Sequence, residues 1–453
     1  METTEVRPIY AGPRGTAIKI LNRVERTDAY LDKLLDSELR SKEISDLDKG
    51  LLAEIVHGVT RWQGRLDWIL NGFTHGNFSK SEVNVKNGLR VALYQILFLT
   101  HVPHYAAVNE AVEFIKRFRG EKSANLVNAV LRNIIRSLDG IHYPKVDDDP
   151  VQYLAVYYSH PQWLVKRWLN RFGREEVKKL LTTNNEVPTL TLRVNKLKNT
   201  TPEFLSLLDK QNIPYQGSAF IDYFIKVRSL SGISQMDIFQ KGFFSIQDES
   251  AALPVLLLSP QPGDRIIDMC AAPGGKTTFI GELMNNQGEI LAVDKYESKL
   301  NLIKLSCERL GITNVRLIVG DSSEIETLQA DKVLVDAPCS GLGVLRKKPD
   351  IKWKREPEDI NRLVHLQKGL LENASRLLKP GGVLVYSTCT TEPEENSLLI
   401  KSFLEKHPEF IVEDASKLVN KAVVTPEGFV ETFPFRHHID GSFAARLIKS
   451  SAV

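Results

Sequence analysis

The chain has 453 residues, a formal net charge of +3 and an isoelectric point near 8.4. Its 42% apolar and 25% charged residues are ordinary for a globular protein, so composition selects no special class. A charge of +3 excludes a polycation but leaves room for a local basic surface, so a nucleic-acid partner is permitted without being indicated. The length is enough for about three domains.

The four cysteines are Cys270, Cys307, Cys339 and Cys389. They form no CxxC pair and have no histidine at zinc-ligand spacing, so we expect no metal site and free thiols in a reducing compartment. The N-terminus lacks a charged start followed by an apolar stretch, and no segment approaches the roughly 18 apolar residues of a membrane helix. We therefore expect a cytoplasmic protein without a membrane partner, and no feature requires more than a monomer.

The N-terminal third has a helical pattern throughout, from about residue 14 to 138. The mixed Gly, Pro and acidic stretch at 139 to 150 is typical of a linker. The pattern predicts an all-α bundle over residues 1–143. Its clearest apolar stripe, at i, i+3, i+4 and i+7, is formed by Val108, Ala111, Val112 and Ile115.

The rest of the chain alternates strands and helices. Residues 144–240 give short strand, helix and strand patterns, which predict a small α+β RNA-binding or linker module. Over residues 241–453, apolar strands such as "RIIDMC" and "EILAVD" alternate with amphipathic helices. This order predicts a doubly wound, mainly parallel α/β sheet of Rossmann-like type, with ligands at the carboxyl ends of its strands.

A loop of small residues follows the first of these strands, in "CAAPGGKTT" (270 to 278). A phosphate-binding loop GxxxxGK[ST] would need glycine at Cys270, and the dinucleotide spacing GxGxxG is absent. The loop still allows a ligand to approach the backbone closely and opens a helix. The candidate cofactor residues in it are Cys270, Ala271, Ala272, Pro273, Gly274, Gly275 and Lys276.

An aspartate stands at each of three further strand ends: Asp294, Asp321 and Asp336. A carboxylate after the second strand can accept hydrogen bonds from a ribose diol, and one after the third can reach an adenine amino group. Any one of them alone would more commonly be a turn or helix cap. Three in register predict a site for S-adenosylmethionine.

Two cysteines follow strand ends, in "KVLVDAPCSG" and "GGVLVYSTCT". Carbon 5 of a pyrimidine is a poor nucleophile, so its alkylation needs a thiolate to add first at carbon 6. A second thiol could assist release, and Asp336 could stabilise the negative charge in the ring. Methylation of an exocyclic amine uses a different loop and needs no thiol. The alternative is that Cys339 and Cys389 are small buried apolar residues, the role we assign to Cys307.

Five motifs resemble those of the RNA 5-methylcytosine methyltransferases: "DMCAAPGGKTT", "AVDKYESKL", "VGDSSE", "LVDAPCSGLGVLRKKPDIKW" and "LVYSTCTTEPEEN". The resemblance implies that Cys389 is the nucleophile and that Cys339 promotes product release, beside the catalytic role that its position gives Asp336. It also implies that S-adenosylmethionine binds the loop from Cys270 to Lys276 together with Asp294, Asp321 and Asp336.

The N-terminal stretches "RGTAIKIL" and "DKGLLAEIVHGVTRW" resemble the NusB-like RNA-binding domain. The combination is similar to the RsmB/Sun family and implies methylation of carbon 5 of a cytosine in 16S ribosomal RNA. The same chemistry on transfer RNA, and a non-catalytic ribosome-assembly factor, remain as alternatives. One departure is Ser442, where the family usually has an aromatic residue.

The segment "LRKKPDIKWKR" (345 to 355) is rich in cations and follows the Pro-Cys loop. Cations can neutralise phosphates while an aromatic ring stacks on an exposed base, so we expect this segment to bind RNA in single-stranded or loop form. The residues concerned are Arg346, Lys347, Lys348, Lys352, Trp353, Lys354 and Arg355.

Overall fold

The computed structural model describes residues 9–40, 44–75, 78–228, 230 and 232–451. The chain forms two compact units. The helical unit comprises Met1–Glu186 and Leu345–Lys354, and the sheet unit comprises Val187–Val344 and Arg355–Val453. This division differs from the expected boundaries at 143 and 240, because the helices up to residue 186 pack with the N-terminal ones. The division into three domains stays a prediction.

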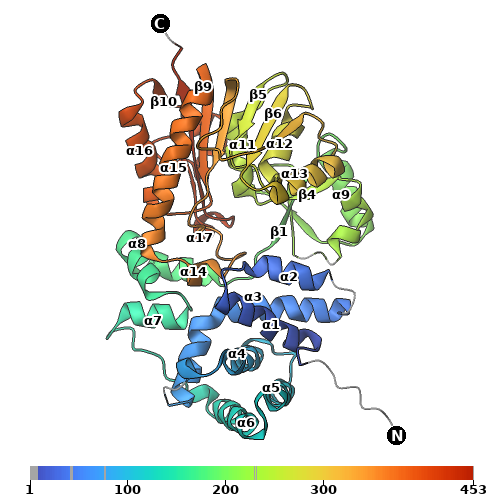
Figure 1. The fold of residues 1–453 in the computed structure, drawn as a ribbon, viewed down its shortest axis with the longest axis vertical. Helices are drawn as coiled ribbons and strands as arrows, with labels where there is room; N and C mark the ends of the chain where they lie inside the picture. Colours follow the sequence, from blue (N-terminus) through green and yellow to red (C-terminus); the bar gives the residue numbers. More distant parts are fainter. Residues whose placement is uncertain (1–8, 41–43, 76–77, 229, 231, 452–453) are drawn as a thin grey trace. The chain divides into compact units, whose positions relative to one another are not determined.

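The helical unit confirms the predicted all-α region (Figure 1). The predicted stripe is buried at Val108, Ala111 and Ile115 and partly buried at Val112. Helix α3 (Asp46–Phe73) approaches α4 (Val83–Phe98) closely at Gly58, where a Cβ atom would lie 1.9 Å from the Tyr94 ring. The helices are α1 (Gly12–Arg26), α2 (Leu31–Leu39), α3 (Asp46–Phe73), α4 (Val83–Phe98), α5 (His104–Arg119), α6 (Glu121–Arg136), α7 (Pro150–Tyr157), α8 (Gln162–Asn184) and α14 (Ile351–Lys354), with 3-10 turns η1 (Phe78–Lys80) and η2 (Leu138–Gly140).

The segment predicted as a linker is an irregular connection that is fastened to α3. The Trp68 indole donates to the His142 carbonyl at 3.0 Å, and Arg65 Nε donates to the Tyr143 hydroxyl at 2.9 Å. The Arg65 guanidinium also lies over the Tyr143 ring, 5.0 Å from its centroid. These contacts hold residues 142 and 143, in the segment that leads to α7, against α3.

The sheet unit begins with a small antiparallel sheet in the order β2-β3-β1-β4. Its strands are β1 (Leu190–Val194), β2 (Tyr215–Gly217), β3 (Phe224–Val227) and β4 (Phe244–Ile246). Helix α9 (Thr201–Lys210) starts with a capping box of Thr200 and Glu203 and buries Phe204 and Leu208 against the sheet. The turn η3 (Ile233–Gln235) and α10 (Asp237–Gln240) precede β4.

The second sheet has the order β10-β12-β9-β8-β5-β6-β7, with β11 paired to β12. Strands β5 to β9 are parallel, and β10, β11 and β12 run antiparallel to their neighbours, so the predicted mainly parallel sheet is confirmed. The strands are β5 (Arg265–Asp268), β6 (Glu289–Asp294), β7 (Val315–Val319), β8 (Ala330–Asp336), β9 (Leu378–Thr388), β10 (Phe410–Val412), β11 (Val430–Thr432) and β12 (Ser442–Lys449).

Helices cover both faces of this sheet (Figure 1). Neighbouring residues of one strand face opposite layers: Ile266 packs in the core of α11 and α12, and Ile267 in that of α15 and α16. The chain winds one way from β5 to β7 and the other way from β8, so β5 and β8 flank the topological switch point. The helices are α11 (Glu249–Leu258), α12 (Gly275–Leu283), α13 (Glu297–Leu310), α15 (Pro357–Leu377), α16 (Ser397–Lys406) and α17 (Pro434–His437), with 3-10 turns η4 (Pro393–Glu395), η5 (Ala415–Lys417) and η6 (Lys421–Val423).

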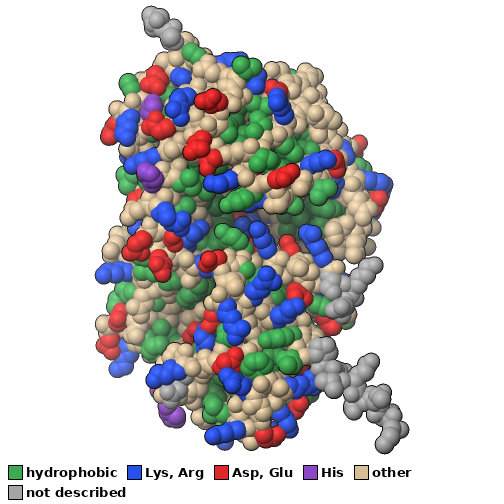
Figure 2. Space-filling model, viewed as in Figure 1, with side chains coloured by type: hydrophobic (Ala, Val, Ile, Leu, Met, Phe, Trp, Pro, Cys, Tyr) green, Lys and Arg blue, Asp and Glu red, His purple; other side chains and the backbone are tan. Residues whose placement is uncertain are grey.

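Acidic and basic side chains are mixed on the surface shown in Figure 2. This agrees with the small net charge of +3. Within the described part of the chain, no helix combines the length and apolarity needed to cross a membrane.

Candidate active site

The site lies at the carboxyl ends of β5, β8 and β9, beside the switch point, where open α/β sheets bind ligands. The loops after β8 and β9 run together: the Ala337 amide donates to the Ser387 carbonyl at 2.9 Å, and the Gly343 amide donates to the Cys389 carbonyl at 3.1 Å. Each loop carries one of the two cysteines that the strand pattern singled out.

The two sulfurs lie against each other. The Cys339 Sγ atom is 3.2 Å from the Cys389 Sγ atom, and the Cys389 amide donates to Cys339 Sγ at 3.3 Å. The Cys389 side chain is exposed, whereas Cys339 is only partly accessible. Residues 50 positions apart in the sequence therefore place two thiols on one spot of the surface, and Cys389 is the more accessible.

The surroundings of the two sulfurs decide where the proton sits. The pKa of Cys339 is raised well above its ordinary value by its hydrogen bond with Cys389, by burial, and by the charges of Cys389 and Glu395. Cys339 is therefore held as a thiol, and its proton can be donated to Cys389.

A partly buried ion pair lies within electrostatic range of Cys389. Lys276 Nζ is 2.5 Å from Asp336 Oδ2, and the Ser387 hydroxyl donates to Asp336 Oδ1 at 2.8 Å. Burial alone would lower the pKa of Lys276. The charge of Asp336, its hydrogen bond and then the charge of Cys389 raise the pKa by more than burial lowers it, so the pKa of Lys276 lies above its ordinary value. Lys276 is thus a cation that pairs with a carboxylate and interacts electrostatically with Cys389. The sequence had placed it only in the cofactor loop.

The predicted cofactor loop joins β5 to α12. Gly274 has φ of 101°, and a Cβ atom there would lie 3.1 Å from the Ile303 Cα atom, so the loop needs glycine. The Thr277 hydroxyl donates to Asp268 Oδ2 at 2.7 Å, and burial raises the pKa of Asp268 to about 7. Burial likewise raises the pKa of Cys270, which makes a reactive thiolate unfavourable at this position.

The two aspartates at the ends of β6 and β7 differ in how they are engaged. Asp294 is buried; its Oδ1 atom accepts the Tyr296 amide at 3.1 Å, and its Oδ2 atom has no hydrogen bond among the described residues. Asp321 accepts both the amide and the hydroxyl of Ser323, and these bonds lower its pKa. Asp294 is thus the better placed of the two to accept new hydrogen bonds.

Cys307 confirms its expected structural role. It is buried in α13 among Leu300, Ile303 and Leu310, and burial raises its pKa to about 11.

Arg193 of β1 was missed by the sequence reasoning. Its side chain is fully buried and lies 2.6 Å from Glu282 Oε1 of α12. It also donates to the Gly275 carbonyl at 2.8 Å, to the Thr278 hydroxyl and to Gln247. The small sheet therefore holds the start of α12, where the cofactor loop ends. The one available signal was an arginine inside the apolar strand "TLTLRVN".

The prediction that the segment after the Pro-Cys loop binds RNA is wrong for Arg346 and Lys352, which are buried, and stays a prediction for its other residues. Leu345–Lys354 belongs to the helical unit, where Lys352 is 1% exposed and donates to the Arg61 carbonyl at 2.9 Å. The Trp353 indole donates to the Thr60 carbonyl at 2.7 Å, and Lys354 donates to Ala29. Backbone carbonyls take the place of the expected phosphates. Arg346 is also buried, and Lys348 is exposed.

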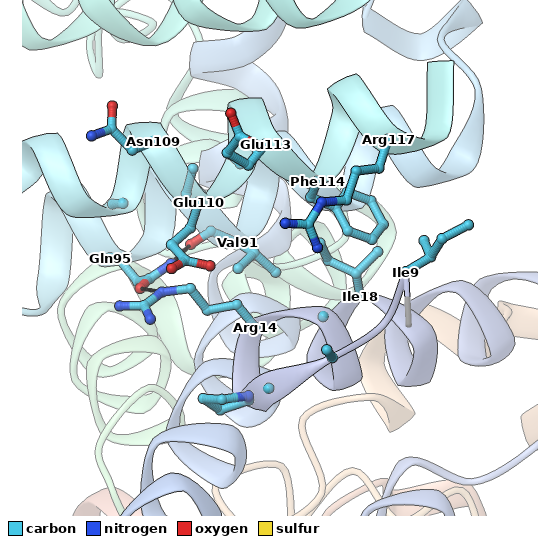
Figure 3. A pocket seen from close by; sticks show the side chains of 18 residues that line it. Ile9, Arg14, Ile18, Val91, Gln95, Asn109, Glu110, Glu113, Phe114 and Arg117 are labelled. Atoms are coloured by element: carbon cyan, nitrogen blue, oxygen red, sulfur yellow. Dashed lines mark hydrogen bonds between the residues drawn. The ribbon is translucent and has the colours of Figure 1, made fainter. Parts of the chain in front are cut away.

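A cavity of about 570 Å³ lies elsewhere, between α1, α4 and α5 of the helical unit (Figure 3). Arg14 Nε donates to Gln95 Oε1 at 2.7 Å, and Glu110 points towards the same pair. Arg117 lies beside Phe114 on the other side of the cavity. No cysteine lines it, so it is separate from the thiol site.

Comparisons with known proteins agree with this arrangement. The 16S rRNA methyltransferase RsmB/F family matches residues 255–448, and the NusB family matches residues 12–136. The ferredoxin-like domain of RsmF/B-like methyltransferases matches residues 160–233. In solved structures, the protein PH0851 superimposes with a TM-score of 0.80 at 28% identity, over 96% of this chain and 99% of that one. NSun6 from Pyrococcus horikoshii, solved with SFG, gives a TM-score of 0.59 at 26% identity over 64% of this chain and 99% of that chain.

Two curated relatives match along almost their whole length. The "Probable ribosomal RNA small subunit methyltransferase B" of Bacillus subtilis (strain 168) is 37% identical over 99% of this chain and 100% of that protein. The ribosomal RNA small subunit methyltransferase B of Yersinia pseudotuberculosis serotype O:3 (strain YPIII) is 34% identical over 96% of this chain and 98% of that protein. With both halves of its architecture matched, this chain belongs to the RsmB family of methyltransferases.

Proposed function

We propose that this protein transfers a methyl group from S-adenosylmethionine to carbon 5 of a cytosine in 16S ribosomal RNA. The observation that carries the proposal is the pair of thiols, with Sγ atoms 3.2 Å apart, together with the Lys276 and Asp336 ion pair. Methylation at nitrogen or oxygen needs no thiol, whereas carbon 5 must first be activated by addition at carbon 6. Two thiols with different proton affinities suit a reaction that needs one nucleophile and one later proton acceptor.

Cys389 is the nucleophile in this proposal. Its sulfur is exposed, and the ammonium of Lys276 and the thiol of Cys339 both favour its thiolate form. The thiolate forms a bond to carbon 6, and the electron pair of the ring double bond moves towards carbon 5 and into the ring. Asp336, with the proton that Lys276 shares with it, stabilises this charge at N3.

The loop and the strand ends suit S-adenosylmethionine. The backbone of Cys270 to Gly275 offers a close approach without side-chain bulk at the two glycines, and the free Oδ2 atom of Asp294 can accept from a ribose hydroxyl. When bound, S-adenosylmethionine supplies an electrophilic methyl group. Asp321 is assigned to the adenine side. The P. horikoshii NSun6 structure named above was solved with SFG.

Cys339 acts in the release step. Two causes of its raised pKa, the hydrogen bond with Cys389 and the charge of Cys389, disappear once Cys389 is bonded to carbon 6. Burial and the Glu395 charge still raise the pKa of Cys339, but less than before, so its proton passes to water more readily. Its thiolate takes the proton from carbon 5, the double bond re-forms, and the carbon–sulfur bond breaks with the electron pair returning to Cys389.

The ribosomal RNA substrate is carried over from the names of the relatives, and the match to the NusB family supports an RNA partner. We expect a protein with this substrate to work in the cytoplasm. The two hydrogen-bonded thiols and the ion pair argue against a non-catalytic assembly factor, because such a factor does not need them.

The test is to incubate the protein with labelled S-adenosylmethionine and either unmodified 16S ribosomal RNA or unmodified transfer RNA. We expect label in 16S RNA, at carbon 5 of a single cytosine, identified by nuclease digestion and mass spectrometry. Label on transfer RNA alone would keep the chemistry and overturn the substrate. Label on a ring nitrogen or an exocyclic amine would overturn the chemistry.

A further inference from the structure

A carboxylate beneath the two cysteine loops has no part in the chemistry described so far. Glu395 ends the turn η4, six residues after Cys389, and its side chain is completely buried. Burial of a carboxylate is costly unless hydrogen bonds compensate for lost hydration. Burial raises the pKa of Glu395, and the hydrogen bonds of Ser340 and Gln367 oppose this.

The hydrogen bonds of Glu395 converge on the Pro-Cys loop. Its Oε1 atom accepts the Ser340 amide at 2.8 Å and the Gln367 side-chain amide at 3.0 Å, and its Oε2 atom accepts the Ser340 hydroxyl. Gln367 of α15 also donates to the Pro338 carbonyl at 3.0 Å. The residues on both sides of Cys339 are therefore tied to one carboxylate.

The same network reaches the loop of the second cysteine. The hydroxyls of Ser340 and Thr390 are 2.7 Å apart, and the Glu392 amide donates to Thr390 Oγ1 at 3.3 Å. An ionised carboxylate only accepts, so the Ser340 proton points to Glu395 and the Thr390 proton points to Ser340. The hydrogen bonds then run in one direction, from the loop after β9 through the loop after β8 to Glu395.

We infer that Glu395 is a positioning residue that holds the Cys339 and Cys389 loops in register, so that both sulfurs face the same cytosine. The inference rests on the proposed roles of the two thiols and adds a residue that the reaction itself does not touch. Arg355 supports the loop from its other side, donating from Nε to the Ser340 carbonyl at 3.0 Å. Cys339 is thus held through its neighbours in the chain, while its own sulfur contacts Cys389.

Glu395→Gln is the sharpest variant. Glutamine has nearly the same shape, but one carboxylate oxygen becomes an NH₂ group that cannot accept. With the glutamine oxygen at the Ser340 amide, the NH₂ group faces the Ser340 hydroxyl, which must accept from it and reverse its hydrogen bond with Thr390. The hydrogen bonds then no longer run in one direction to residue 395, so the Pro-Cys loop is expected to move away from Cys389. Ser340→Ala removes only the hydroxyl bridge and should have a smaller effect in the same direction. Glu405→Gln, at an exposed position of α16, is the matched control.

The first readout needs no RNA. Diamide oxidises two neighbouring thiols to a disulfide, while its azo group takes up both hydrogens and becomes a hydrazine. Peptide mapping measures how fast the disulfide between Cys339 and Cys389 forms. We expect it to form about tenfold more slowly in Glu395→Gln than in wild type or Glu405→Gln. Wild-type rates in both Glu395→Gln and Ser340→Ala would overturn the inference. Should Glu395→Gln not fold, as judged by its thermal transition, Ser340→Ala alone decides.

The second readout uses the reaction. With 16S RNA and S-adenosylmethionine, Glu395→Gln should accumulate a gel-stable protein–RNA adduct, and it should add nothing further in a Cys339→Ala background. If Glu395→Gln changed the amount of adduct in the Cys339→Ala background as much as it does in the wild-type background, its effect would be merely structural, and the inference would be contradicted. If Cys339→Ala itself forms no adduct, the proposed division of thiol roles fails, while the disulfide rate still tests Glu395 independently.

Discussion

Cys389→Ala is expected to abolish methyl transfer, by at least about 10⁴-fold, and to leave the affinity for S-adenosylmethionine unchanged. The loss is large because carbon 5 has no other route to activation once the thiolate is gone. Asp294→Ala should give the opposite pattern. Loss of a charged hydrogen bond of about 1.5–3 kcal/mol weakens cofactor binding roughly 10-fold to 100-fold. Methyl transfer by Asp294→Ala should persist at saturating cofactor.

Titration calorimetry and single-turnover transfer to 16S RNA measure the two quantities separately. Cys307→Ala is the matched control, since Cys307 is a buried thiol of the same unit, on α13, and faces the hydrophobic core. Its transfer rate should stay near that of wild type. Equal loss of cofactor affinity in Cys389→Ala and Asp294→Ala would contradict the division of roles.

Asp336→Asn is expected to lower kcat/KM by about 10²- to 10³-fold. The asparagine keeps the size of the side chain and can still bond Ser387, but it removes the charge that faces Lys276 at 2.5 Å. That charge is the main cause that raises the Lys276 pKa, so the pKa of Lys276 falls in the variant. The ammonium then loses its proton at lower pH, and the residual rate should decline at lower alkaline pH than in wild type.

The pH profile of kcat/KM checks this result. Asp331→Asn provides the control, because Asp331 lies at the opposite end of β8 and pairs with Lys379 at 2.6 Å, away from the sulfurs. Its profile should match wild type. A wild-type rate and profile for Asp336→Asn would remove Asp336 and its ion pair from the reaction.

The sequence predicted the placement of the thiols because local pattern and sheet topology were sufficient. Cys339 and Cys389 each follow an apolar strand, and parallel strands end at the same edge, so two distant residues had to meet. The same reasoning predicted that Asp294 and Asp336 lie at the carboxyl ends of their strands, at this edge of the sheet. Glu395 could not be found in this way, since its partners come from α15 and from the loop after β8, and no local period marks them.

The basic segment shows the limit of charge patterns. A run of cations is read as a surface because burial of a charge is costly, and Lys352 is nevertheless 1% exposed. Burial lowers the pKa of Lys352 well below its ordinary value, and the Arg61 charge adds to this, so the surroundings disfavour the charged form of the lysine. Its acceptor, the Arg61 carbonyl, lies in α3 about 290 residues earlier, which only the three-dimensional fold could reveal.

The most direct test of the central claim is a denaturing gel of Cys339→Ala incubated with unmodified 16S RNA and S-adenosylmethionine, run beside the Cys339→Ala/Cys389→Ala double variant. The account predicts a gel-stable protein–RNA adduct in the single variant, because release is blocked, and none in the double variant. An adduct that survives the loss of Cys389 would contradict the assignment of the nucleophile.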